Sequence, residues 1–215
     1  MRIFLDSADT KEVRKAMKTG MIDGVTTNPT LIKATGELPT NVYAELIEMD
    51  VNDISMEVSG DYDTMRRKAL ELVRLFGPAV TIKLPMNEEG LKLCTELSLE
   101  GIRTNVTLVF NAAQALLVAK AGATYVSPFV GRIDDQGYAG LEVVRSISAL
   151  YNQMGASTKV LAASIRTPHR AVRSFFNGAH VVTMPPKVFW GMWNHVLTDT
   201  GLAQFDKDAQ GLTLL

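Results

Sequence analysis

The sequence predicts an α/β fold in which eight parallel strands, each followed by a helix, close into a (β/α)8 barrel. Three observations support this prediction. The strand-like runs are apolar on both faces, each is followed by a run with helical spacing of apolar residues, and the alternation repeats eight times within 215 residues. Eight such units favour closure of the sheet. The alternative is an open doubly wound sheet, but no Gly-x-Gly-x-x-Gly turn follows any strand.

The first four units occupy the amino-terminal half of the chain. Their expected strands are rich in β-branched and apolar residues: 2–5, 24–29, 53–58 and 80–85. Their expected helices carry apolar residues at helical spacing: 11–18, 41–48, 62–76 and 88–99. Asn28-Pro29 and Pro85 end two of the strands, because a proline cannot donate a ladder hydrogen bond.

The last four units repeat the pattern. Their expected strands are 102–109, 125–130, 159–163 and 180–184, and their expected helices are 112–121, 141–154, 170–176 and 188–195. Residues 1–198 therefore form one barrel domain. Residues 199–215 form a tail that mixes charges with Leu202 and Phe205, and we expect it to pack on the barrel or on a neighbouring subunit.

Composition narrows the class of protein. With 47% hydrophobic and 21% charged residues the chain is typical of globular proteins, and its net charge of −1 is spread evenly, which argues against nucleic-acid or membrane partners. The single cysteine, Cys94, cannot form an intrachain disulfide, and no apolar stretch approaches the ~18 residues of a membrane span. We expect a cytoplasmic protein without a signal peptide.

A single lysine, Lys83, lies in the otherwise apolar strand 80–85 and near its carboxyl end. One interpretation is a lysine whose ammonium reaches water past the end of the strand. The other is a desolvated amine that acts as a nucleophile, because a low-dielectric interior disfavours the charged form. The strand alone does not decide between them.

Polar residues also stand at the ends of the other strands. In a barrel of this kind the carboxyl ends of all strands face one mouth. The set comprises Asp6, Asn28, Glu57, Lys83, Asn105, Thr107, Ser127, Arg132, Ser164 and Arg166. Each has an ordinary interpretation by itself, such as a turn residue or a helix cap. Together they predict a site.

The composition of this set indicates the chemistry. Imine formation on a lysine requires proton transfer to expel water, and carbon–carbon cleavage requires a base for a hydroxyl proton, so two carboxylates suit the two steps. The two guanidiniums and the hydroxyl of Arg132, Arg166 and Ser164 suit a phosphate, which implies a phosphorylated sugar. No histidine ends a strand, which argues against a His-based metal site. Asp6 and Glu57 could bind magnesium, but a lysine beside them competes for the same role as the positive charge.

Six segments, in order along nearly the whole chain, resemble the transaldolase family, in its short subfamily that also contains fructose-6-phosphate aldolases. They are Phe-Leu-Asp-Ser-Ala at 4–8, Gly-Val-Thr-Thr-Asn-Pro-Thr at 24–30, Thr-Ile-Lys-Leu-Pro at 81–85, Asn-Val-Thr-Leu-Val-Phe at 105–110, Ser-Pro-Phe-Val-Gly-Arg-Ile-Asp at 127–134 and Ala-Ala-Ser-Ile-Arg-Thr at 162–167. The resemblance implies a class I (Schiff-base) aldolase barrel that needs neither cofactor nor metal.

By position, the resemblance makes Lys83 the imine-forming lysine and Asp6 the acid/base of bond cleavage. Glu57, with Thr107, would hold the water of imine formation and hydrolysis. Three side chains would bind the hydroxyls of a dihydroxyacetone unit: Asn28, Asn105 and Ser127. Three others would bind the phosphate: Arg132, Ser164 and Arg166.

Two positions separate the activities within the subfamily. The aldolases resemble one another in having Gln in place of Glu57 and Tyr in place of Phe129, so Glu57 and Phe129 favour transfer over release. The resemblance therefore implies a transaldolase of the pentose phosphate pathway, which moves dihydroxyacetone from fructose 6-phosphate or sedoheptulose 7-phosphate to an aldose phosphate. The alternatives are a fructose-6-phosphate aldolase and a sugar-phosphate-binding barrel without catalysis. The subfamily also implies a homo-oligomer, with a decamer of pentamer rings as the expected form.

Overall fold

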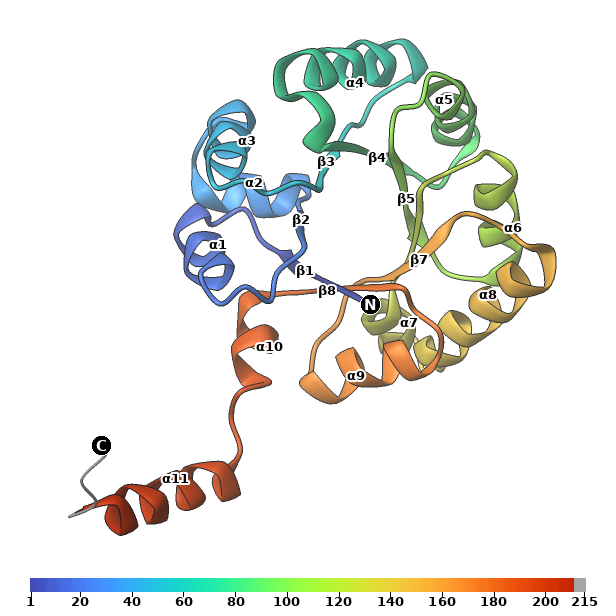
Figure 1. Cartoon of the computed structure of the whole chain (residues 1–215). Coiled ribbons are helices and arrows are strands. Elements are labelled where there is room, and N and C mark those ends of the chain that lie inside the picture. The colour runs from blue at the N-terminus through green and yellow to red at the C-terminus, as the bar shows by residue number, and fades with distance from the viewer. Residues whose placement is uncertain (211–215) are drawn as a thin grey trace.

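The strands form a closed barrel in the expected order. The computed structural model describes residues 1–210, and every neighbouring pair from β1 to β8, and β8 with β1, is parallel (Figure 1). The strands are β1 (Arg2–Asp6), β2 (Gly24–Thr26), β3 (Ile54–Glu57), β4 (Val80–Pro85), β5 (Thr104–Val109), β6 (Tyr125–Pro128), β7 (Lys159–Ala162) and β8 (Val181–Met184). The predicted (β/α)8 barrel is confirmed.

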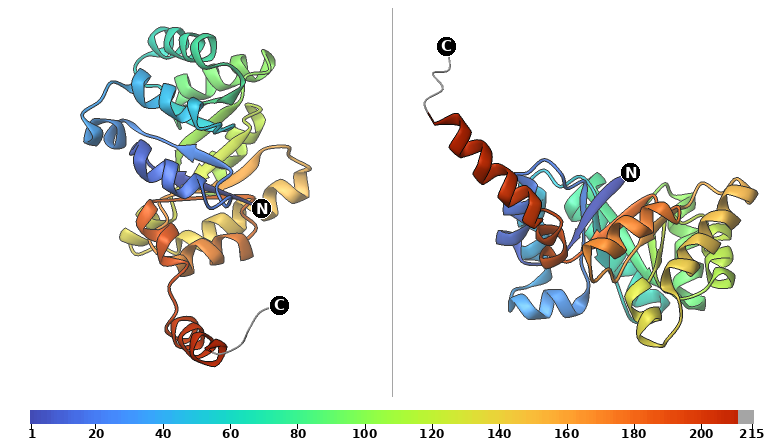
Figure 2. Two further views of the ribbon diagram at one scale, coloured as in Figure 1. Left: turned by 60° about the vertical axis from the view of Figure 1, so that its left-hand side comes forward. Right: turned by 90° about the horizontal axis from the view of Figure 1, so that it is seen from below.

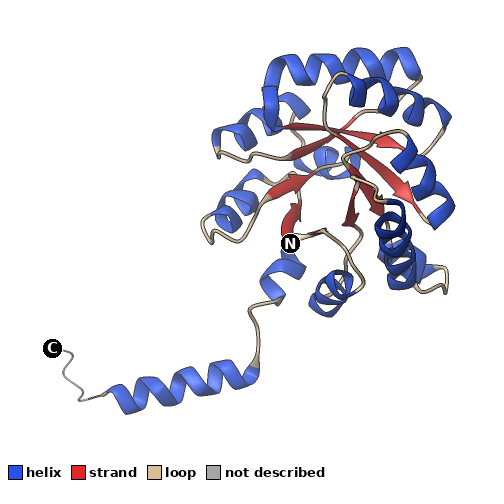
Figure 3. Ribbon diagram, turned by 45° about the vertical axis from the view of Figure 1, so that its right-hand side comes forward, coloured by secondary structure: helices blue, strands red, loops and turns tan. Residues whose placement is uncertain are grey.

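Helices surround the barrel, as Figure 3 shows in blue around the red strands. They are α1 (Thr10–Met17), α2 (Pro29–Thr35), α3 (Pro39–Glu48), α4 (Tyr62–Phe76), α5 (Glu88–Leu99), α6 (Ala112–Lys120), α7 (Val130–Asp135), α8 (Gly140–Met154), α9 (Pro168–Phe176) and α10 (Pro186–Gly191), with a 3₁₀ turn, η1 (Gly77–Ala79). Helix α11 (Val196–Ala209) follows them in the chain. Helices α4 and α5 begin and end at the predicted residues.

Two short helices were not predicted, and they shorten the strands before them. Helix α2 starts directly after Asn28, whose side chain accepts a hydrogen bond from the Leu31 backbone, with Pro29 at the first position. Helix α7 starts at Val130, after Phe129. The expected strands 24–29 and 125–130 were therefore too long, because their last residues begin helices.

The eighth helix also ends earlier than predicted. Helix α10 stops at Gly191, and His195 caps the next helix by accepting a hydrogen bond from the Leu197 backbone. The predicted helix 188–195 therefore merged the end of one helix with the cap of another. Helix α11 contains most of the predicted tail 199–215, and residues 211–215 of that tail lie outside the described part.

Helix α11 extends away from the barrel in both views of Figure 2. None of its residues is buried, and its apolar side chains, among them Leu202 and Phe205, are exposed. Within residues 1–210, no helix combines the length and the apolar character needed to cross a membrane.

Alternation along the strands decides which side chains enter the barrel. In β1, Phe4 joins a small apolar cluster with residues of β6, β7 and β8, and Asp6 two residues later lines a cavity. A Cβ at Gly24 would lie 2.7 Å from the Phe4 ring, so glycine makes room for that ring. The large apolar core lies between the strands and the helices.

A buried carboxylate, Asp53, closes the amino end of the barrel. It is fully buried, and it accepts hydrogen bonds from Thr81 (2.8 Å) and Tyr125 (2.7 Å) and pairs with Arg2 (3.0 Å) and Arg103 (3.3 Å). Burial, and then the charge of Asp53, raise the pKa of Tyr125 to about 12, so its hydroxyl remains a donor. This cluster joins Asp53 to four other parts of the chain and was not predicted.

Replacing Asp53 with alanine removes the acceptor that all four groups share. Since the buried hydroxyls of Thr81 and Tyr125 would lose their acceptor and both guanidiniums would lose their counter-charge, we expect Asp53→Ala to lower the free energy of unfolding by about 3–5 kcal/mol. Urea denaturation measures this change. The control is Glu142→Ala, which removes the exposed pair with Arg145 and should cost less than about 1 kcal/mol. Equal losses in both variants would contradict the role of Asp53.

Candidate active site

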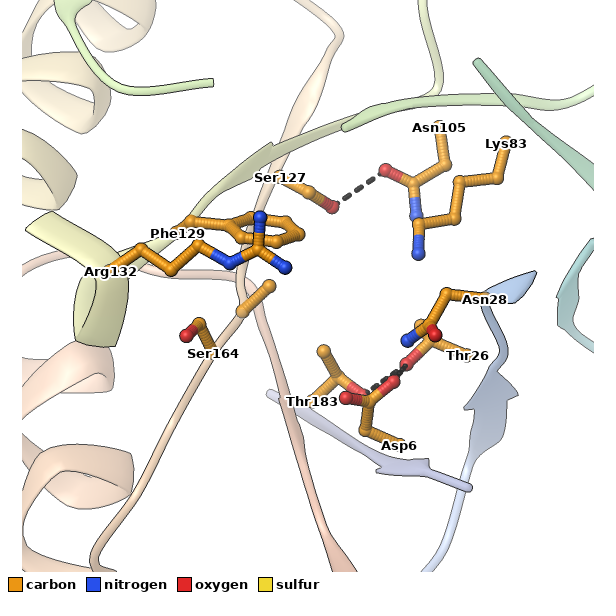
Figure 4. Close-up of a pocket in the computed structure, with 11 residues that line it drawn as sticks. Asp6, Thr26, Asn28, Lys83, Asn105, Ser127, Phe129, Arg132, Ser164 and Thr183 are labelled. Atoms are coloured by element: carbon orange, nitrogen blue, oxygen red, sulfur yellow. Dashed lines mark hydrogen bonds between the residues drawn. The ribbon is translucent and has the colours of Figure 1, made fainter. Parts of the chain in front are cut away.

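A cavity of about 110 Å³ opens at the carboxyl ends of the strands (Figure 4). It is lined by Asp6, Thr26, Asn28, Lys83, Asn105, Ser127, Phe129, Arg132, Ala163, Ser164 and Thr183. All of these except Thr26, Ala163 and Thr183 were predicted as site residues. The structure therefore brings together side chains from six strands and from the segments that follow them.

Lys83 lies deep in this cavity rather than at the surface. The strand register pairs Lys83 with Glu57 on β3 and with Asn105 on β5. Its side chain is 6% exposed, and Nζ contacts the Glu57 Oε2 atom at 2.9 Å and donates to the Thr27 carbonyl oxygen at 2.9 Å. The interpretation in which the ammonium reaches water is therefore wrong.

Asp6 approaches from the opposite side of the cavity on β1, as Figure 4 shows. Thr26 donates a hydrogen bond to Asp6 Oδ1 (2.7 Å), and the hydroxyls of Thr26 and Thr183 lie 2.6 Å apart. Burial raises the pKa of Asp6, while the charge of Lys83 and the hydrogen bond from Thr26 oppose that rise. The carboxyl group is thus suited to exchange a proton.

Sequence reasoning missed both threonines. The signal was present for Thr26, because it lies two residues before Asn28 and so faces the same side of the strand. Thr183 is the inward polar residue of β8, the one strand for which no polar end was identified.

Asn105 and Ser127 form a fixed polar wall beside Lys83. The amide of Asn105 donates to Ser55 Oγ (3.0 Å) and accepts from Ser127 Oγ (2.7 Å), so both of its ends are engaged. Both side chains are buried. The wall therefore presents oriented hydrogen-bonding groups to a hydroxylated ligand.

The opposite rim carries positive charge. The Arg132 guanidinium lies 4.9 Å above the Phe129 ring, which Phe110 contacts edge-on at 6.1 Å between centroids. Ser164 follows β7 with a left-handed φ of 58°, an unusual conformation for a residue other than glycine. Arg132 and Ser164 both line the cavity, and Figure 4 shows them on its same side.

Three predicted residues do not line the cavity. Glu57 contacts Lys83 but lines a neighbouring pocket among α2, α3 and α4. Thr107 is buried next to Leu108, which has a φ of 61° at a register shift in β5. Its Oγ1 atom has no hydrogen-bond partner among residues 1–210. Arg166 is exposed, and both of its terminal nitrogens donate hydrogen bonds to the Asp135 carboxylate.

The site as a whole combines one buried amine, two carboxylates and a basic rim. An electrophilic carbonyl beside Nζ would be within reach of Glu57 for proton transfer, and Asp6 is available for a second proton. In the described part of the chain, no three His, Cys, Asp or Glu side chains gather closely enough to hold a metal ion.

The sequence as a whole was compared with known proteins. The family model described as transaldolase/fructose-6-phosphate aldolase matches residues 3–214. The probable transaldolase of Caulobacter vibrioides is 47% identical over 209 residues, which are 97% of this chain and 96% of the relative.

Two further relatives give the same result. The probable transaldolase of Thermodesulfovibrio yellowstonii is 45% identical over 99% of both chains, and that of Clostridium botulinum is 46% identical over 97% of this chain and 96% of the relative. The chain belongs to the transaldolase/fructose-6-phosphate aldolase family.

Proposed function

We propose that this enzyme is a transaldolase that transfers a dihydroxyacetone unit between sugar phosphates through a Schiff base on Lys83. The observation that supports this most directly is the buried Lys83 amine in contact with Glu57 at 2.9 Å, with Asp6 in the same cavity. The relatives named above carry the name probable transaldolase, which agrees with the proposal.

Imine formation begins at the ion pair. Because Glu57 stabilises the ammonium of Lys83, the free amine forms when a proton leaves Nζ, and Glu57 is placed to accept it. The amine then adds to the ketone carbon of the substrate. Glu57 returns a proton to the carbinolamine oxygen, which leaves as water. The Oγ1 atom of Thr107, which has no hydrogen-bond partner in the part of the chain that the structure describes, is a suitable acceptor or donor for that water.

Cleavage of the carbon–carbon bond is assigned to Asp6. Its carboxylate takes the proton of the hydroxyl at C4 of the ketose, the C3–C4 bond breaks, and its electron pair moves into the iminium to give an enamine. An aldose phosphate leaves, and the enamine attacks the aldehyde of an acceptor such as erythrose 4-phosphate. Asp6 then returns its proton to the new hydroxyl, and water releases the product from Lys83.

Recognition is divided between the two sides of the cavity. Asn28, Asn105 and Ser127 would bind the hydroxyls of the dihydroxyacetone unit, and the engaged amide of Asn105 supports a fixed orientation. The phosphate would lie at the basic rim, with Arg132, Ser164 and Arg166. Phe129 brings an apolar ring without a hydroxyl to the cavity, which favours retention of the enamine until an acceptor arrives.

A homo-oligomer, in the form of a decamer of pentamer rings, is part of the proposal. Helix α11 extends from the barrel with its apolar residues exposed, among them Leu197, Leu202 and Phe205. An exposed apolar helix of this kind is costly in water unless another surface covers it. A second copy of the chain is the partner that this proposal assigns.

A cytoplasmic location also belongs to the proposal. Cys94 is a buried free thiol that lies 3.3 Å from the hydroxyl of Thr104. A protein with one unpaired thiol is suited to a reducing compartment.

Borohydride trapping tests the reaction and its lysine together. Incubation with fructose 6-phosphate and borohydride should add a reduced three-carbon unit to Lys83, seen by intact mass and peptide mapping. Lys83→Met should abolish the adduct and lower transfer by at least about 10³-fold, because Lys83 is the one lysine among the described residues that line the cavity. The exposed lysine variant Lys120→Met is the matched control and should retain both. An adduct at another lysine would overturn the assignment.

The same preparation separates transfer from release. With fructose 6-phosphate and erythrose 4-phosphate, a coupled assay should detect glyceraldehyde 3-phosphate at a steady rate. Without the acceptor, free dihydroxyacetone should not accumulate beyond the enzyme concentration. Steady release of dihydroxyacetone without an acceptor would indicate a fructose-6-phosphate aldolase instead.

Burial raises the pKa of Asp6, and the hydrogen bond from Thr26 partly opposes that rise. Because it lowers the pKa of Asp6, its removal in Thr26→Val should raise that pKa further. Asp6 must be ionised to act as a base, so activity falls as the pH drops through its pKa. The acid limb of the kcat/KM profile should therefore move to higher pH. Thr104→Val, on the far side of β5 against Cys94, should leave the limb in place. A shift to lower pH would contradict this role.

The exposed apolar side chains of α11 can be tested for a role in assembly. The double variant Leu202→Ser/Phe205→Ser removes two exposed apolar side chains of α11 while keeping the barrel intact. We expect sedimentation velocity to show a smaller species than the wild type, with an unchanged circular dichroism spectrum. Leu99→Ser, at a still more exposed position at the end of α5, is the control. An unchanged assembly in the double variant would reject α11 as an interface.

A further inference from the structure

We propose that Asp135 is a positioning residue of the phosphate site. Its carboxylate holds the two terminal nitrogens of Arg166 and so keeps the Nε edge of that guanidinium beside Ser164. This inference rests on the proposed function and deepens it. It explains why Arg166, although predicted to bind phosphate, does not line the cavity and is instead exposed, with its Nε atom near Ser164.

The contact between the two side chains is bidentate. The two terminal nitrogens of Arg166 donate to the two carboxylate oxygens of Asp135, and this hydrogen bonding lowers the pKa of Asp135. An exposed arginine otherwise samples many rotamers, whereas a two-point contact holds the plane of its guanidinium. The pair therefore contributes orientation, even where its net energy is small.

The close packing of Gly131 against Arg166 and Ser164 shows which edge of the Arg166 guanidinium lies toward Ser164. A Cβ on Gly131 would lie 2.7 Å from Arg166 Nε, 3.0 Å from Ser164 Oγ and 2.3 Å from the Ser164 carbonyl oxygen. The Gly131 backbone also donates to that carbonyl at 3.0 Å. The Nε atom of Arg166 and the Ser164 hydroxyl therefore both lie close to Gly131, the residue that directly precedes Arg132.

The Nε group remains available for an anion. Asp135 engages only the terminal nitrogens, and among residues 1–210 Nε makes no hydrogen bond. An oxygen of a phosphate placed between Arg132 and Ser164 can therefore accept from Nε without displacing Asp135. A guanidinium binds one anion end-on and a second one side-on, because its five donors point along different edges.

Helix α7 holds both parts of this arrangement. It carries Arg132, whose guanidinium lies over Phe129, and it carries Asp135 one turn later. Its other acid, Asp134, pairs with Arg170 at 3.3 Å and accepts from the Gly140 backbone at 3.0 Å, which ties the end of the helix to α8 and α9. A single short helix therefore supplies one arginine of the phosphate site and positions the other.

Asp135 has two opposing effects on phosphate binding. Its negative charge weakens the attraction of the rim for an anion, and its bidentate contact holds Arg166 in place. Both side chains are exposed, so solvent and salt screen the charge effect. Misplacement of the Arg166 guanidinium also lowers affinity, and solvent and salt do not screen this effect. We therefore expect orientation to dominate.

The variant Asp135→Asn keeps the size of the side chain and removes the bidentate acceptor. The KM for fructose 6-phosphate should rise about threefold to tenfold with kcat within about twofold, and the Kd for inorganic phosphate should rise in parallel. Borohydride trapping with dihydroxyacetone, which lacks a phosphate, should be unchanged. The matched control is Glu142→Gln, which makes the same charge change in the exposed pair with Arg145.

A double-mutant cycle tests whether Asp135 acts through Arg166. In an Arg166→Gln background, Asp135→Asn should have no further effect on KM or on the Kd for phosphate. An additive effect, a fall in KM in the single variant, or an equal loss with dihydroxyacetone would each overturn the inference. A wild-type protein that binds phosphate but neither traps nor transfers the sugar would instead reject the proposed function.

Discussion

The burial of the Lys83 side chain beside Glu57 is the constraint on which the rest of this site depends. A lysine ammonium inside a barrel is stable only with a charged partner and further acceptors, and the structure supplies Glu57 and the Thr27 carbonyl, each at 2.9 Å. The same carboxylate that stabilises the charge is placed to receive the proton. Stability of the resting state and access to the nucleophile therefore come from a single contact.

The two ends of the barrel differ in how completely their buried polar groups are hydrogen-bonded. At the amino end, Asp53 is surrounded by donors from four parts of the chain, which makes a rigid closure. At the carboxyl end, the Thr107 hydroxyl has no hydrogen-bond partner among residues 1–210, and Leu108 and Ser164 have left-handed backbone conformations. Unsatisfied groups and strain of this kind are tolerated where ligands bind, because the rest of the fold compensates for their cost.

Most of the site was predictable because parallel strands impose a simple geometry. Polar residues at the carboxyl ends of strands converge on one mouth, so Asp6, Lys83, Asn105 and Ser127 could be assigned from the alternation of strands and helices. The start of helix α2 was marked by Asn28 as its cap and Pro29 at its first position, although both residues were assigned to the end of a strand. The start of helix α7 was not predictable in this way, since Val130 continues the β-like pattern of the strand before it. Helix α7 in turn carries the acid that engages Arg166.

The sequence by itself determined the eight-unit barrel and the set of polar side chains at its mouth, because periodicity and strand ends are local properties of the chain. Only the tertiary structure decided which of them touch. Glu57 reaches Lys83 from a neighbouring pocket, Arg166 turns to Asp135, and Thr26 and Thr183 meet behind Asp6. These contacts join residues 26 to 157 positions apart, and they depend on strand register and side-chain rotamers that no local pattern encodes.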